Sequence, residues 1–166
     1  MPIAPTSPSV PLIDQALFDK VSAEALRSPR LRKNFNFHGH DSDPSHRLLN
    51  AIEPDSYLAP HRHLDPDKDE TMIALRGRFG IVLFDNDGAV SQTYVLEAGS
   101  SCCGITIPHG IFHTLVSCQS GSILFESKAG PYLPLTAEER AAWAPAEGSD
   151  GVAAYANRLR QLFALS

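Results

Sequence analysis

The sequence predicts a mainly-β fold, a small jelly-roll barrel of the double-stranded β-helix type, with an N-terminal helix and short C-terminal helices. Short apolar stretches follow one another between residues 47 and 128, and turn residues separate them at the spacing typical of sandwiches and barrels. The segment Asp-Asn-Asp-Gly at 85–88 is a strong hairpin signal, since these residues tolerate the positive φ of tight turns. Helical periodicity is confined to the two ends of the chain.

The N-terminal part predicts a tail, a helix and a strand. Residues 1–11 are rich in proline and serine, so we expect them to be disordered or loosely draped. Residues 12–27 carry apolar side chains at helical spacing, and the Ser-Pro pair that follows ends the pattern. We expect this helix to lie against the outside of a sheet. Residues 34–37 alternate polar with aromatic, as in a strand with one buried face.

The strands of the barrel are expected at 47–52, 57–63, 70–76, 79–84, 91–97, 103–107, 112–118 and 122–128. Roughly eight strands suit a jelly roll. After them, Thr136 and Glu139 form a capping box that predicts a short helix ending before Pro145. Ser149 or Asp150 would cap a second helix, whose apolar stripe is Val152, Tyr155, Leu159, Leu162 and Phe163.

Length and composition limit the functions to consider. A chain of 166 residues with 43% hydrophobic and 20% charged residues is long enough for one sizeable core. A formal charge of -5 disfavours a nucleic-acid partner. The N-terminus lacks a secretory signal, the uncharged stretch 104–125 is broken by proline and glycine, and the 3 cysteines show no disulfide spacing. We therefore expect a cytoplasmic protein with no membrane or nucleic-acid partner.

Four side chains form a candidate metal site. His61 and His63 are two positions apart, so in a strand both imidazoles face the same side. Glu70 opens the next predicted strand, and His113 follows a turn that contains Pro108 and Gly110. Three imidazoles and a carboxylate are a donor set for zinc, iron, manganese, nickel or another first-row divalent ion. We expect one such ion as cofactor.

These residues resemble the two-motif signature of the cupins. The first motif reads G, five residues, HxH, three or four residues, E, six residues, G, and here it contains His61, His63, Glu70 and Gly77. The second motif reads G, five residues, PxG, two residues, H, three residues, N. It matches at the residues of the turn and at His113. This sequence departs from the signature in its longer spacing between His63 and Glu70, and at Asp55, Cys102 and Ser117. Asp67 sits at a permitted spacing, but the strand and glycine that follow favour Glu70.

A closer resemblance, to the WbuC-type cupin-fold metalloproteins, covers most of the chain. It rests on residues 12–38, on RLLNAIEP and PHRHLDPDKDET, and on GPY at 130–132. Together with the elements predicted above, it gives a barrel at 47–132, a helix-and-strand extension at 12–46 and a helical appendage at 133–166. It also implies a link with polysaccharide biosynthesis, and it supplies no reaction. Cupin barrels commonly pair through an outer sheet face, so we expect a homodimer in which Thr71, Ile73 and Leu75 supply the apolar patch.

Period-two alternation suggests which residues surround the metal. Tyr57 would share the face of the two paired histidines and is the candidate for handling a proton, whereas Met72 and Ser117 would line the cavity. The cationic cluster Arg30, Arg32 and Lys33 precedes a strand. It either carries anion-binding groups to the rim of the site or forms a solvated basic edge that discourages strand pairing.

The residues support two classes of function. The first is an enzyme, a metal-dependent oxygenase or isomerase that acts on a small polar or anionic metabolite, with carbohydrate derivatives as one class. The second is a non-catalytic small-molecule or metal-binding module, a sensor or storage protein. A metal that only stabilises the barrel is a third option, and it would leave the ligands closed around the ion.

Overall fold

The computed structural model describes residues 10–164, so most of the tail predicted at 1–11 lies outside the described residues. Two helices and eight strands follow one another within residues 10–164. They are α1 (Gln15–Arg27), β1 (Arg32–Asn36), β2 (Ser45–Ile52), β3 (Glu70–Arg76), β4 (Arg78–Phe84), β5 (Val90–Glu97), β6 (Gly104–Ile107), β7 (Phe112–Ser117), β8 (Ser122–Ala129) and α2 (Val152–Gln161).

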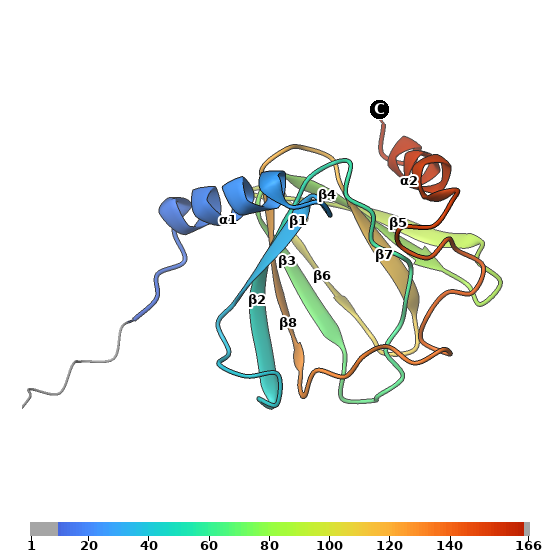
Figure 1. Ribbon diagram of the computed structural model, residues 1–166, viewed down its shortest axis with the longest axis horizontal. Coiled ribbons are helices and arrows are strands. Elements are labelled where there is room, and N and C mark those ends of the chain that lie inside the picture. The colour runs from blue at the N-terminus through green and yellow to red at the C-terminus, as the bar shows by residue number, and fades with distance from the viewer. Residues whose placement is uncertain (1–9, 165–166) are drawn as a thin grey trace, which may run out of the picture.

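The strands form two antiparallel sheets, which confirms the predicted mainly-β fold class. One sheet has the order β1-β2-β8-β3-β6 and the other β5-β4-β7 (Figure 1). β8 lies between β2 and β3, although β2 and β8 are far apart in the sequence. Strands that are distant in sequence therefore become neighbours, as a jelly roll requires.

The core between the sheets is made by side chains from both. Ile52, Met72 and Leu124 of the larger sheet meet Phe79, Ile81, Leu83, Leu96 and Leu115 of the smaller one. Burying each such side chain contributes about 1.5–3 kcal/mol. Gly77 joins β3 to β4 at φ 77°, and a Cβ there would overlap Ser122, so this turn needs glycine.

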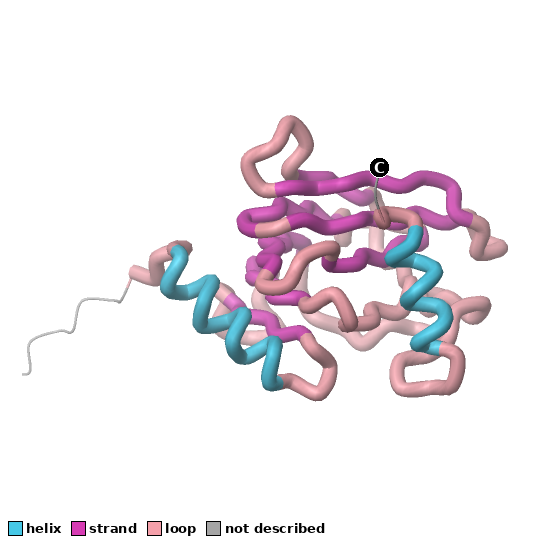
Figure 2. Tube along the Cα trace, turned by 90° about the horizontal axis from the view of Figure 1, so that it is seen from above, coloured by secondary structure: helices cyan, strands magenta, loops and turns pink. Residues whose placement is uncertain are grey.

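Each helix covers the outside of the barrel, as expected for the first of them (Figure 2). Asp14 caps α1 by accepting a hydrogen bond from the Leu17 amide (2.9 Å), and α1 buries Phe18, Val21 and Ala25 against β2 and β8. α2 packs Ala156 and Leu159 against the smaller sheet. Neither helix of the described residues is long and apolar enough to cross a membrane.

Two sequence predictions about elements are wrong. Residues 57–63 are not a continuous strand and pair with β7 only at His61, through an isolated bridge to His113.

Residues 136–143 form turns instead of a helix. The Glu139 carbonyl accepts from the Arg62 amide (2.9 Å) and the Ala141 amide donates to Pro60 (3.2 Å), so contacts with the 60–62 segment use groups that a helix would need. The second C-terminal helix does form, but Gly151 precedes it in place of the expected caps Ser149 or Asp150.

Candidate metal centre

The structure brings the four candidate metal ligands together from three parts of the chain. His61 and His63 lie in the segment before β3, Glu70 is the first residue of β3, and His113 is on β7. Two backbone hydrogen bonds join His61 to His113, at 3.0 and 2.8 Å. The amide of Gly110 donates to the His63 carbonyl at 2.6 Å, which fastens the turn before β7 to the same segment.

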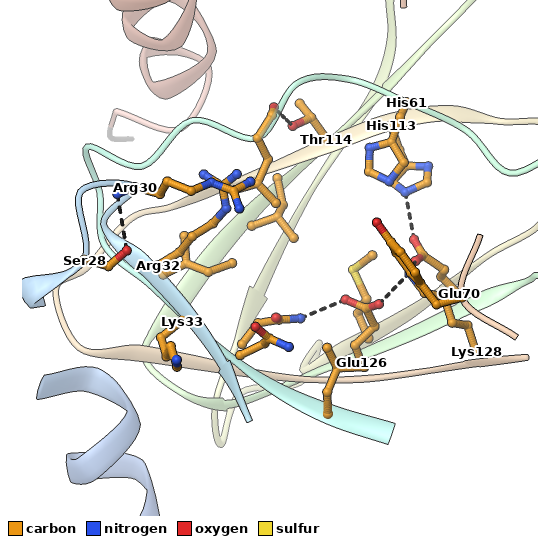
Figure 3. Close-up of a pocket in the computed structure, with 18 residues that line it drawn as sticks. Ser28, Arg30, Arg32, Lys33, His61, Glu70, His113, Thr114, Glu126 and Lys128 are labelled. Carbon is orange, nitrogen blue, oxygen red and sulfur yellow. Dashed lines mark hydrogen bonds and ion pairs between the residues drawn. The ribbon is translucent and has the colours of Figure 1, made fainter. Parts of the chain in front are cut away.

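Glu70 lies at the centre of this cluster (Figure 3). One carboxylate oxygen is 3.2 Å from His63 Nε2 and the other is 2.9 Å from His113 Nε2. His61, His63 and Glu70 offer ligand atoms that all lie within 4.8 Å of one another. The His113 ring centroid is 4.8 Å from that of His61 and 6.4 Å from that of His63. Asp67, the other carboxylate at a permitted spacing, is exposed in the preceding loop.

The orientation and charge of the imidazoles suit metal binding. Nδ1 of His61 faces the Ala59 carbonyl at 3.1 Å and Nδ1 of His113 faces the Ile111 carbonyl at 2.9 Å. Such contacts fix the ring and leave Nε2 as the coordinating nitrogen. Burial, and then the neighbouring His113, lowers the pKa of His61 to about 3. His61 is therefore neutral near pH 7, the form that a metal ion requires.

The carboxylate of Glu70 is ionised. Burial acts to raise its pKa, but the close contacts with His113 and His63 and the charge of Lys128 outweigh burial and hold the pKa well below its usual range. A buried carboxylate beside three imidazoles is the donor chemistry of a divalent transition-metal site. The residues present thus fit one such ion.

Sequence reasoning missed two charged residues of this site, Glu126 and Lys128 on β8. The Lys128 ammonium contacts Glu70 Oε1 and lies 2.9 Å from Glu126 Oε1, while Asn50 Nδ2 donates to Glu126 Oε2 at 2.8 Å. Burial acts to lower the pKa of Lys128, but the two carboxylates outweigh it and raise the pKa. Burial, and then Glu70, raises the pKa of Glu126. Glu126 and Lys128 are two positions apart in the strand predicted at 122–128, so both side chains should project from the same face. This spacing was the signal in the sequence that could have identified them.

A cavity of about 500 Å³ extends from the cluster. His61, Glu70 and His113 line it at one end, with Glu126 and Lys128, and Arg30, Arg32 and Lys33 line the other (Figure 3). Apolar side chains between them include Ile52, Leu58, Met72 and Leu115. Met72 thus lies where the sequence placed it.

The cationic end of the cavity is already paired within the chain. Both Arg30 and Arg32 donate to the Glu147 carboxylate, at 2.7 and 2.8 Å. Arg32 also donates to the Tyr57 carbonyl at 2.8 Å, and Lys33 lies 3.9 Å from Glu24. These three residues give the cavity positive charge, but the two arginine side chains hold a carboxylate of the chain itself.

Tyr57 and Ser117 lie outside this cavity, contrary to expectation. The Tyr57 hydroxyl donates to the Pro145 carbonyl at 2.7 Å, and the ring packs with Tyr155 on the other side of the segment. Burial is the main cause that raises the pKa of Tyr57. Ser117 is fully buried and donates to the Gln119 carbonyl at 2.8 Å. Tyr57 is displaced because its segment is not a regular strand, so alternation does not apply and Leu58 faces the cavity instead.

Comparison with known proteins gives a family without an assigned activity. The family model described as "Domain of unknown function (DUF6016)" matches residues 13–96, a range that includes His61, His63 and Glu70 and ends before His113. No curated protein matches the chain.

Several solved structures are similar to parts of the chain. KdgF from Halomonas sp. is 16% identical, over 61% of this chain and 82% of that chain, with a TM-score of 0.48. A cupin-2 domain containing protein from Shewanella frigidimarina is 19% identical, over 59% and 80%, at 0.45. An RmlC-like cupin from the same organism is 18% identical, over 59% and 75%, at 0.43. At such low identities and scores these likenesses carry no information on activity.

Proposed function

Because this chain belongs to the DUF6016 family, which is described only as a domain of unknown function, we propose its function from the site itself. We propose that it is a metal-dependent enzyme of cupin type. His61, His63, Glu70 and His113 hold one divalent transition-metal ion, and the cavity admits a small polar or anionic metabolite to it. The observation that carries this proposal is the convergence of three imidazoles on a buried carboxylate at the end of a 500 Å³ cavity.

The chain's own residues would bind and orient the metabolite. Ile52, Leu58, Met72 and Leu115 form apolar walls that exclude water, and the cationic residues give the cavity a potential that attracts anions. A bound divalent ion supplies Lewis-acid polarisation of ligand oxygen atoms or, as ferrous iron, redox chemistry with dioxygen. Oxygenation and isomerisation are the reaction classes that we propose.

A non-catalytic binding module is the second candidate, and one observation favours it. Tyr57, the residue expected to handle a proton, donates to Pro145 and does not line the cavity. Oxygen consumption or isomer formation by the iron- or manganese-loaded protein with candidate metabolites would distinguish an enzyme from a binding module.

We also propose, from the resemblance in sequence alone, that the chain is a cytoplasmic WbuC-type protein with a carbohydrate-derived ligand in polysaccharide biosynthesis. On the same basis it would act as a homodimer without a nucleic-acid or membrane partner.

Metal analysis tests the proposed centre. Protein purified without added metal is expected to contain about one transition-metal ion per chain, as four-ligand sites do. His61→Ala and His113→Ala should each lose that ion, while His40→Ala, which changes an exposed histidine outside the cluster, should keep it. Elemental analysis of all four proteins gives the answer. Full metal content in His61→Ala or His113→Ala would remove that residue from the ligand set, and a metal-free wild type that also takes up none from solution would refute the centre.

A further inference from the structure

Lys128 occupies a position in the cavity that metal ligation alone does not explain. β8 lies in the middle of the larger sheet, where Lys128 pairs with His46 of β2 and Glu126 pairs with Met72 of β3. The side chain of Lys128 is 21% exposed and that of Glu126 is 12% exposed. Figure 3 shows both beside Glu70, on the side of the cavity that holds the histidines. A charged pair is costly to bury, so its presence here calls for a ligand or a structural counterpart.

The net charge of the group formed by Glu70, Glu126, Lys128 and the three imidazoles differs with and without a metal ion. In the protein alone, the Lys128 ammonium is shared by the carboxylates of Glu70 and Glu126. When a divalent ion joins the group, its two charges and the ammonium together exceed the two carboxylates by about one positive charge, because the imidazoles are neutral as ligands. A buried excess of one positive charge is neutralised best by a ligand with a single negative charge.

Lys128 also has hydrogen-bonding capacity to spare. An ammonium has three N–H groups, and its contacts with Glu70 and Glu126 account for two of them. Asn50 holds the far oxygen of Glu126, which keeps the carboxylate and the lysine beside it in place. Arg30 and Arg32, by contrast, both donate to Glu147. Lys128 is therefore the cation best placed to contact a ligand that reaches the metal ligands.

We propose that Lys128, held by Glu126 and Asn50, is the specificity-determining residue of the site and selects a small monoanion with a carboxylate. The carboxylate binds at the metal centre and accepts a hydrogen bond from Lys128. A neutral polyol of the same size lacks the charge that the loaded site requires. This inference rests on the proposed metal-binding function and adds the class of ligand to it.

The test measures ligand binding to the cobalt-loaded protein by calorimetry. Glycolate and gluconate serve as monoanionic probes, and ethylene glycol serves as the neutral one. Wild type should bind at least one of the anions and bind ethylene glycol far more weakly. Lys128→Met should lose about 10- to 100-fold in anion affinity, the usual effect of removing a hydrogen bond to a charged group. Glu126→Gln should raise the affinity, because it removes one of the two carboxylate charges that share the Lys128 ammonium.

The matched control is Lys20→Met. Lys20 is an exposed lysine of α1 that does not line the 500 Å³ cavity. Among the described residues it forms no ion pair with Glu70 or Glu126, so its loss should leave anion affinity within about threefold of wild type.

The outcomes separate this inference from the metal proposal. A wild type that does not retain cobalt refutes the metal centre itself. Cobalt retention with no binding of either anion refutes the inference, as does equal anion affinity in wild type and Lys128→Met. If Lys128→Met does not fold, Glu126→Gln decides, because an unchanged or lower anion affinity in that variant overturns the role of Lys128.

Discussion

Pro60 explains why the side chains of residues 57–63 do not alternate as a strand would require. Proline has no amide hydrogen and a fixed φ, so it interrupts a strand ladder. Pro60 is fully buried, and pairing with β7 begins only at His61. Thr114 donates to the Leu58 carbonyl at 2.7 Å and holds the segment against β7 without regular pairing. Leu58 and His61 consequently face the cavity, and Tyr57 packs on the other side.

This position of Tyr57 predicts a structural effect for its hydroxyl. Tyr57→Phe removes the hydrogen bond to Pro145 and should lower the free energy of unfolding by about 1 kcal/mol. Metal content and anion affinity should stay at wild-type values. Urea unfolding and elemental analysis check the two parts. Unchanged stability together with impaired ligand binding would show that Tyr57 acts in ligand binding and not in stabilising the fold.

At the scale of elements, the segment before α2 is fastened to β1 by charge. Glu147 accepts hydrogen bonds from Arg30, next to β1, and from Arg32, within it. The hydrogen bond from Arg30 is the main cause that lowers the pKa of Glu147, and Arg32 adds to it against the effect of partial burial. The Glu147 side chain is 39% exposed, so solvent screens these ion pairs and limits their contribution.

The lowered pKa of Glu147 predicts a pH-dependent stability. Below about pH 4.3 the carboxyl group takes up a proton in the unfolded chain but resists it in the folded protein. The ionised Glu147 carboxylate therefore stabilises the fold fully above about pH 4.3. This stabilisation is lost as the pH falls through the lower pKa that Glu147 has in the folded protein. Glu147→Gln should lower the free energy of unfolding by up to about 1 kcal/mol at pH 6, and the difference from wild type should shrink as the pH falls below about 4.3.

Urea unfolding between pH 6 and pH 3 measures this difference. Glu138→Gln, which changes an exposed glutamate of the same C-terminal region, should give a curve parallel to wild type. A Glu147→Gln deficit that is the same at every pH would contradict the role of charge.

At the scale of the whole molecule, a metal centre that joins the segment before β3, β3 itself and β7 links ion binding to the stability of the barrel. A ligand at one hundred times its dissociation constant adds about 2.7 kcal/mol to folding. For a chain of this length the midpoint of thermal unfolding should rise by roughly 5–11 °C on metal addition. Calorimetry before and after chelation measures the rise. His113→Ala should not show it, and an equal rise in that variant would place the ion elsewhere.

The expected homodimer remains a prediction, and the structure narrows the surface on which it depends. Leu75 packs against the cluster under α1, which leaves Thr71 and Ile73 as the more available part of the patch. We expect light scattering to give the mass of a dimer for wild type and of a monomer for Ile73→Lys. A monomeric wild type would contradict the expectation, and a dimeric Ile73→Lys would assign pairing to another face.

The sequence by itself determined the features that local spacing controls. Period-two alternation and turn residues predicted most strands, the hairpin at 85–88 and the place of α1. The motif that contains His61, His63 and Glu70 identified candidate ligands, and the structure places their ligand atoms close together. These patterns are readable because strand geometry and turn dihedrals depend on residues a few positions apart.

Only the tertiary structure decided what depends on distant parts of the chain. The pairing of β8 with β3 brings Lys128 and Glu126 to Glu70, and contacts with the 60–62 segment prevent a helix at 136–143. Glu147 reaches the arginines at the other end of the chain in the same way. The physical reason is that the partner of a buried charge or of a free backbone group is set by sheet topology, which joins residues that no local pattern relates.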